Sequence, residues 1–310
     1  MSTNFDCVVT YHQNIHTCGV ARFNHYLAEF LQVPMMDFDE LGNRACSFPL
    51  ISIKESEMIQ SDIAYLSTVI KSKKFRYSLI LHSFVGSETE IEVLQSAERV
   101  MALNAQMASQ ISIYRPDVIT GFTVPTPLLK DSDSTNYKIR LITFGMAHKI
   151  RSSGYKKVAD LLKIDGLSSI LEISSALHEG TEFDDQFFNV GREISEVFDG
   201  HVEFLGFLAD YEVARRVQSA DVMLAFFPEG ARENNNSVLS AMSMGTPVIT
   251  NLDAWSPSWL KHNESVFDIN QMSEFPSKPT LKRVGNAARY AVAPYTFMTL
   301  TSLLTDVIEQ

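Results

Sequence analysis

The segment 220–251, ADVMLAFFPEGARENNNSVLSAMSMGTPVITN, constrains the fold more than any other part of the chain. Its pattern predicts a buried strand over Asp221–Phe227, a polar loop, a short helix over Ser237–Met244, a glycine and a buried strand over Thr246–Thr250. In a parallel α/β sheet, ligands bind beyond the carboxyl ends of the strands, where the N-terminus of the next helix favours an anion. The segment therefore predicts a phosphate-binding loop, with an ordinary strand–helix connection as the alternative.

Strand and helix patterns alternate through the rest of the second half of the chain. Strands are expected at Lys138–Phe144, Ser169–Ile173, Val202–Gly206 and Ser265–Ile269. Helices are expected at Tyr155–Leu162, Phe187–Phe198, Asp210–Ser219 and Pro257–His262. This alternation indicates βαβ units and a doubly wound parallel sheet.

The first half shows the same alternation. Its expected strands are Phe5–Tyr11, Pro34–Phe38, Tyr77–His82, Arg99–Asn104 and Asp117–Gly121. Its expected helices are Val20–Leu31, Ser61–Ser72, Thr89–Ala97 and Gln106–Ser112.

A chain of 310 residues exceeds the usual size of one hydrophobic core, so two domains are expected. The Pro-containing and then Ser/Asp-rich run that ends at Lys130–Asn136 is the best candidate for a linker. We therefore expect an α/β protein with two Rossmann-like domains, 1–136 and 137–290, facing a cleft. A C-terminal helix near Phe297–Glu309, within 291–310, is expected to pack back on the first domain.

Charge and cysteine content limit the partners and the compartment. The net charge of −11 argues against a nucleic-acid backbone or an anionic membrane as the main partner. Cys7, Cys18 and Cys46 show no CxxC spacing, which indicates thiols in a reducing compartment. No apolar run approaches the ~20 residues that span a bilayer, and the chain does not open on a signal-peptide pattern. A soluble, cytoplasmic protein is expected, and the oligomeric state is not indicated.

Two turns carry residues suited to binding a phosphorylated ligand. Gly19 opens the helix after the first strand and would allow a ligand close to the backbone, although a plain turn glycine is an equal alternative. The turn 144–155 concentrates positive charge in His148, Lys149 and Arg151, which would neutralise a leaving diphosphate. A solvated basic loop is the other interpretation of this turn.

Few other residues show a catalytic pattern. His82 ends a buried strand and would contact a substrate hydroxyl or polarise a reacting group, or else it is a satisfied core histidine. Asp131 and Asp133 have the DxD form of a metal–diphosphate motif, but no strand leads into them. No HExxH, Walker A or GxSxG motif occurs, so no metal site is expected.

The second half resembles the nucleotide-sugar-binding domain of GT-B glycosyltransferases, especially family 4. The resemblance rests on VEFLGFLADYEVARRVQS at 202–219, which is followed by AD, a buried strand, a polar loop and SAMSMGTPVIT. CGVARFNHYLAEFL is similar to the family's first glycine-containing loop and helix, and FGMAHKIRSSGY stands where the family has a basic GRLxxxKG motif.

The resemblance assigns donor contacts to several residues. Phe207 would contact the base, and His148, Gly19, Asn236 and Ser237 would lie at the phosphates. Lys149 and Arg151 would stabilise the leaving diphosphate.

The family's two glutamates are absent, because Arg232 and Ser240 stand at their positions. Glu233 would take the place of the first and, with Arg232, orient the sugar. His82 would lie near the acceptor or the anomeric carbon.

The resemblance implies an enzyme that moves a hexosyl or pentosyl group from a nucleoside-diphosphate sugar, UDP- or GDP-linked, to an acceptor hydroxyl. The acceptor would be a glycan, a lipid-linked sugar or a small molecule. The reaction would retain the anomeric configuration and need neither a metal nor another cofactor. Two alternatives remain open: a GT-B enzyme that modifies nucleic-acid bases, and a non-catalytic sugar-nucleotide-binding protein.

Overall fold

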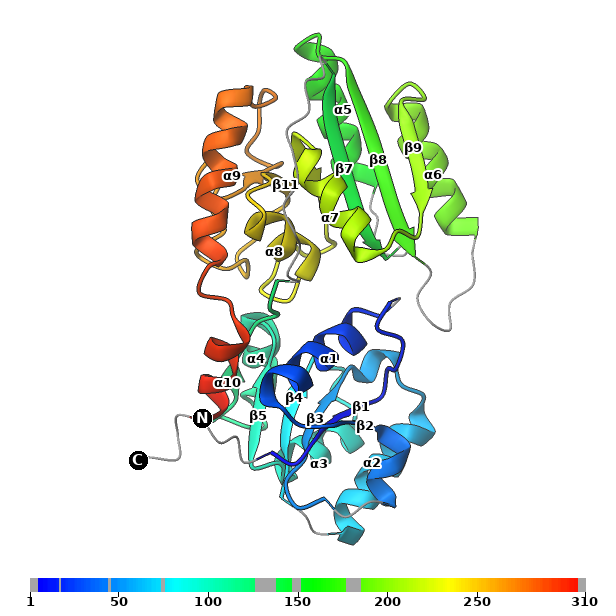
Figure 1. Cartoon of the computed structure of the whole chain (residues 1–310), viewed down its shortest axis with the longest axis vertical. Helices are drawn as coiled ribbons and strands as arrows, with labels where there is room; N and C mark the ends of the chain where they lie inside the picture. Colours follow the sequence, from blue (N-terminus) through cyan, green and yellow to red (C-terminus); the bar gives the residue numbers. More distant parts are fainter. Residues whose placement is uncertain are drawn as a thin grey trace. The chain divides into compact units, whose positions relative to one another are not determined.

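The computed structural model describes residues 5–16, 18–43, 46–73, 76–125, 138–146, 152–176 and 185–305 (Figure 1). The chain divides into two compact units, Met1–Val124 with Tyr295–Gln310, and Pro125–Pro294. Each unit contains one parallel six-stranded sheet, which confirms the predicted α/β class with two doubly wound domains. The divisions fall at 124/125 and 294/295, whereas the sequence placed them at 136/137 and 290/291.

The sheet of the first unit has the strand order β2-β1-β3-β4-β5-β6. Its strands are β1 (Val8–Thr10), β2 (Met35–Asp37), β3 (Leu50–Ile53), β4 (Ser78–Leu81), β5 (Arg99–Ala102) and β6 (Ile119–Thr120). Its helices are α1 (Gly19–Leu31), α2 (Gln60–Lys73), α3 (Glu88–Ser96), α4 (Ala105–Ile111) and α10 (Phe297–Thr305), with short 3-10 helices η1 (Phe38–Gly42) and η2 (Glu55–Glu57). The order reverses between β1 and β3, which makes their carboxyl ends the topological switch point of this sheet.

Alternating side chains of these strands build two hydrophobic layers, one on each face of the sheet. Val8, Leu50, Ile80 and Met101 pack in one cluster with residues of α1 and α10. Their neighbours along the strands pack in the other cluster with residues of α2, α3 and α4: Val9, Ile51, Leu79, Leu81 and Val100. This two-sided burial explains why the strands are continuous apolar runs.

The C-terminal helix α10 packs on the first unit. The ring of Phe297 lies 5.7 Å from that of Phe23 and 6.1 Å from that of Phe30, both on α1. Leu300 and Leu304 are buried in the same cluster as the strands. The unit therefore takes its covering helices from both ends of the chain.

The sheet of the second unit has the order β12-β11-β10-β7-β8-β9. Its strands are β7 (Ile139–Met146), β8 (Ser169–Ala176), β9 (Val202–Gly206), β10 (Val222–Leu224), β11 (Val248–Thr250) and β12 (Phe267–Asp268). Its helices are α5 (Ser152–Ile164), α6 (Asp185–Val197), α7 (Asp210–Ser219), α8 (Asn236–Ser243) and α9 (Lys278–Val292). Numbered within the unit, this is the Rossmann order 3-2-1-4-5-6, with its switch point between β7 and β10.

A glycine turn fixes where α8 ends. Gly245 adopts φ of +79°, its N–H donates to Met242 O, and the N–H of Thr246 donates to Ala241 O at 3.0 Å. This is a Schellman motif, which favours glycine at the left-handed position. A Cβ at Gly285 of α9 would lie 2.2 Å from Gly245 O, so α9 approaches the same turn closely.

Among the strands and α-helices, three elements differ from the sequence-based expectations. The predicted helix Pro257–His262 is wrong: the segment forms turns, because the Ser265 hydroxyl donates to Trp259 O and accepts from Lys261 N. Strand β3 and helix α9 were not predicted. None of the helices within the described ranges is long and apolar enough to cross a membrane.

Candidate functional site

The switch point of the second sheet places the carboxyl ends of β7 and β10 side by side. The loop after β7 carries His148, Lys149 and Arg151, and these three lie outside the described residues. The candidate linker 130–136, with Asp131 and Asp133, lies outside them as well. Within the described residues, the site consists of the loop after β10, the loop after β11 and the N-terminus of α8.

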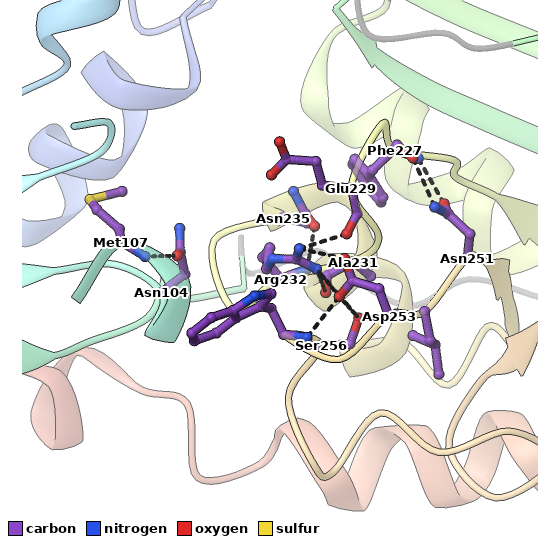
Figure 2. A network of polar contacts seen from close by, with 12 residues as sticks. Asn104, Met107, Phe227, Glu229, Ala231, Arg232, Asn235, Asn251, Asp253 and Ser256 are labelled. Carbon is purple, nitrogen blue, oxygen red and sulfur yellow. Dashed lines mark hydrogen bonds and ion pairs between the residues drawn. The ribbon is translucent and has the colours of Figure 1, made fainter. Parts of the chain in front are cut away.

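The loop after β10 is fastened to the loop after β11 by one asparagine. Asn251 accepts from Phe227 N and donates to Phe227 O, both at 2.8 Å, as Figure 2 shows. The backbone of Asn251 also accepts from Ala231 N at 2.9 Å. These bonds fix both ends of the turn 227–231, which leads from the strand to α8.

Arg232 lies at the centre of a buried network in this loop (Figure 2). Its Nη1 and Nη2 donate to the two carboxylate oxygens of Asp253, at 2.8 and 2.7 Å. Nη2 also donates to Glu229 O at 2.6 Å, and Nη1 to Ala231 O at 3.1 Å. The Arg232 side chain is 7% exposed, so its charge is directed into the protein rather than to solvent.

Asp253 is adapted to this partner. Burial alone would raise the pKa of its carboxyl, but hydrogen bonds from Arg232 and from Trp255 N outweigh that effect and lower the pKa below its ordinary value. The carboxylate is therefore charged at neutral pH, and the two residues form a bidentate ion pair.

Gly230 is required where this pair meets the backbone. It has φ of +90°, and a Cβ there would lie 3.0 Å from Asp253 Cγ and 3.1 Å from Arg232 Nη1. Any other residue would be strained in backbone and would press on the ion pair. The PEGARE run thus combines a glycine turn with an internal charge pair.

The N-terminus of α8 follows directly. Asn235 precedes the helix and accepts from Arg232 N at 2.6 Å, while Asn236 accepts from the Ser240 hydroxyl at 3.3 Å. Asn236 and Ser237 are the first two residues of α8 and are half-buried, as is Glu233. The helix dipole and the backbone N–H groups of this first turn provide positive potential beside the switch point.

Phe207 lies in the same unit, immediately after the edge strand β9. Its side chain is 52% exposed, and Gly206 before it has φ of +66°. An exposed aromatic ring at the carboxyl end of a strand offers a face on which a base can stack.

Gly19 and His82 belong to the first unit. Gly19 begins α1 and is exposed, and a Cβ there would meet nothing within 4 Å, so packing within the described chain does not require glycine. His82 follows β4 and is half-buried, with Nε2 3.0 Å from the buried Ser52 hydroxyl and its ring 5.1 Å from that of Phe23. His82 therefore contacts residues of its own unit and also lies at the carboxyl end of β4.

Sequence reasoning missed Asn251 and Asp253. The available signal was the sequence NLD directly after the apolar strand β11, since it places an amide and a carboxylate beyond the carboxyl end of the strand next to β10. Their partners are distant along the chain, so only the sheet order identifies them.

No protein-family model matches the sequence, and the sequence matches no curated protein. Solved structures do resemble the chain over nearly its whole length. HepE of Anabaena, in complex with UDP and glucose, is 11% identical over 97% of this chain and 99% of its own, with a TM-score of 0.70. Sucrose-phosphate synthase of Thermosynechococcus elongatus is 12% identical over 97% of each chain, with a TM-score of 0.71.

A glycosyltransferase of Rickettsia africae shows the same likeness, at 12% identity over 99% of this chain and 98% of its own, with a TM-score of 0.59. At these identities the likeness is one of fold. The chain therefore has the GT-B fold of these glycosyltransferase structures.

Proposed function

We propose that the protein is a glycosyltransferase that moves a sugar from a nucleoside-diphosphate sugar to an acceptor hydroxyl. The observation that carries this proposal is the switch point of the second sheet, where a fastened loop delivers the N-terminus of α8 beside β10. Such a helix end binds phosphate through backbone N–H groups and the helix dipole. The GT-B fold and the UDP and UDP-glucose bound in HepE support the same assignment.

We assign separate parts of the donor to separate residues of the site. Lys149 and Arg151, with His148, neutralise the diphosphate as it leaves, aided by the first turn of α8 at Asn236 and Ser237. Phe207 stacks on the base, because its ring is exposed. These roles place the cations where negative charge develops in the transition state.

In this proposal the ion pair of Arg232 and Asp253 positions the loop that carries Glu233. Arg232 is committed to Asp253, so it holds the loop that presents Glu233, and Glu233 contacts the transferred sugar. Gly19 and His82 of the first unit contact the donor phosphates and the acceptor hydroxyl, respectively. The acceptor is a glycan, a lipid-linked sugar or a small molecule.

Replacement of the basic loop tests the donor site. The double variant Lys149→Ala/Arg151→Ala is expected to weaken UDP binding roughly 10-fold or more, because each charged hydrogen bond contributes about 1.5–3 kcal/mol. Lys156→Ala/Lys163→Ala is the matched control, since it removes the same charge from α5 at exposed positions. Equal affinities of the two double variants by titration calorimetry would remove the basic loop from the proposal.

The base-stacking role has its own control. Phe207→Ala is expected to weaken UDP binding by about 1–3 kcal/mol, the usual contribution of an aromatic platform under a base. Tyr211→Ala removes another exposed ring, 71% exposed on α7, and should leave the affinity unchanged. A larger loss in the Tyr211 variant would assign the base to a different surface.

Retention and metal independence are part of the proposal. The sugar is expected to keep its anomeric configuration, which NMR of the first product formed determines. EDTA should leave the affinity for UDP-glucose unchanged. A strict metal requirement for donor binding would instead favour Asp131 and Asp133 as a metal–diphosphate site.

A non-catalytic sugar-nucleotide-binding protein is the second candidate. It is favoured by Arg232 and Ser240 at the positions of the family's glutamates, because Arg232 is buried in an ion pair and Ser240 is 2% exposed. Release of UDP from UDP-glucose, measured with and without a panel of hydroxyl acceptors, distinguishes the two. Turnover supports the enzyme, whereas tight binding without turnover supports the binder.

A further inference from the structure

A cluster of three metal-ligating side chains lies in the first unit, and none of the three is assigned a contact with the donor. His12, Cys18 and Glu57 each place one ligand atom within 4.8 Å of the other two. His12 Nε2 lies 3.3 Å from Glu57 Oε2. His12 is 6% exposed, Cys18 is 1% exposed, and the Glu57 side chain is 18% exposed.

The topology of the sheet explains why these residues meet. His12 follows β1, Cys18 directly precedes α1, and Glu57 ends the 3-10 helix η2 that follows β3. The strands β1 and β3 are neighbours at the switch point of this sheet. The carboxyl edge at a switch point is where open α/β sheets bind ligands.

The loops that carry His12 and Cys18 are braced before any ligand binds. Thr10 Oγ1 donates to His12 O at 2.9 Å and itself accepts from Asn24 Nδ2 of α1 at 2.9 Å. The Cys18 N–H donates to Asn14 O at 2.9 Å, and Arg22 Nε donates to Ile15 O at 3.0 Å. The two ligands therefore sit on a common framework formed by β1 and α1.

The spacing of the ligand atoms suits a tetrahedral ion. Zinc binds sulfur at about 2.3 Å and nitrogen or oxygen at about 2.0–2.2 Å, which sets neighbouring ligand atoms roughly 3.3–3.7 Å apart. The histidine–glutamate pair is already at that separation, and the contacts of the thiol are at most about an ångström longer. Imidazole, thiolate and carboxylate together form a ligand set typical of zinc.

We propose that His12, Cys18 and Glu57 bind a zinc-type divalent ion. Three protein ligands leave the fourth position to water or to an oxygen of a bound molecule. Binding replaces the proton of the Cys18 thiol, which passes to solvent, and the bond formed is between the sulfur and the ion. One thiolate and one carboxylate together offset the two positive charges of the ion itself.

Lys54 is compatible with this site. Its Nζ forms an ion pair with Glu57 Oε1, while Oε2 is the oxygen near His12. The carboxylate therefore uses one oxygen for the lysine and the other for the ion.

Cobalt substitution tests the site on the full chain. Protein stripped with a chelator and kept reduced is titrated with Co²⁺, and we expect saturation at one equivalent, with a thiolate-to-cobalt absorption band that Zn²⁺ abolishes. Cys18→Ser should remove the band, and Glu57→Gln should weaken binding at least 10-fold. Because Cys18 is buried, Glu57→Gln gives a second, partly exposed variant, and circular dichroism checks that each variant is folded.

Two matched control variants distinguish this cluster from other cysteines and histidines of the same unit. Cys46→Ser changes another thiol of the same unit, whose sulfur lies 3.2 Å from that of Cys7, and His25→Ala changes a histidine that pairs with Glu29. Both should keep the band and the affinity. Absence of stoichiometric binding, or loss of the band in Cys46→Ser but not in Cys18→Ser, would overturn the proposal. The readout contains no sugar nucleotide, so failure here leaves the proposed glycosyl transfer untouched.

Discussion

The buried ion pair of Arg232 and Asp253 gives the sharpest stability prediction. Asp253→Asn keeps the shape of the side chain but leaves the guanidinium, 7% exposed, without its counter-charge. Removing one partner of a buried pair costs about 3–5 kcal/mol, and the Asp253 side chain is 35% exposed. We therefore expect a loss somewhat below this range, about 2–3 kcal/mol, after allowance for solvent screening.

Glu212→Gln is the matched control within the same unit. Glu212 also accepts two hydrogen bonds from an arginine, Arg215, and its side chain is 29% exposed. The difference is that Arg215 is 59% exposed, so this surface pair should contribute less than about 1 kcal/mol. Comparing the two variants therefore measures the effect of burying the arginine of the ion pair.

Tryptophan fluorescence during urea unfolding measures both variants. The two tryptophans of the chain, Trp255 and Trp259, lie in the second unit, so their emission follows the unit that carries both pairs. Equal losses for Asp253→Asn and Glu212→Gln would refute the reasoning that burial makes the Arg232 pair important.

Two further predictions concern a carboxyl and a glycine. Burial and a hydrogen bond with Glu55 raise the pKa of Glu90 to about 8, above its ordinary value of 4.5. The folded state therefore holds a proton that the unfolded state releases, so stability is present at low pH and is lost as pH rises from about 4.5 through 8. The free energy of unfolding should fall by a few kcal/mol between about pH 5 and 9, and Glu90→Gln should flatten that slope; an unchanged slope would contradict the assignment. Gly230→Ala should lower the free energy of unfolding by about 1 kcal/mol more than Gly200→Ala, because both glycines have positive φ but only a Cβ at position 230 would meet Asp253. Equal melting temperatures of the two variants would contradict this steric contribution.

Much of the fold follows from local patterns in the sequence. The apolar runs that become β4 and β10 are buried at every position, and such runs are recognisable without knowledge of their partners. Strand β3 was missed because LISI is only four residues long and follows Pro49, with no alternation to distinguish it. The false helix at Pro257–His262 arose because a side chain, Ser265, satisfies the backbone there.

The sequence indicates which loop forms the candidate site, but it does not indicate the contacts between the side chains of that loop and the rest of the unit. The polar loop before α8 indicates an anion site from its own composition. The engagement of Arg232 could not be predicted, because Asp253 follows a different strand and meets the loop only through the sheet order. The cluster of His12, Cys18 and Glu57 is hidden for the same reason, since three separate segments contribute to it.

The binding of nucleoside-diphosphate sugars tests the central claim most directly. Thermal shifts of the full chain with UDP-, GDP-, ADP- and CMP-sugars should show stabilisation by one nucleotide class, beginning with UDP-glucose. A donor at about 100 times its dissociation constant stabilises by about 2.7 kcal/mol, and the Lys149→Ala/Arg151→Ala variant should need roughly tenfold more donor for the same shift. No shift with any of the four classes, confirmed by calorimetry, would contradict the account.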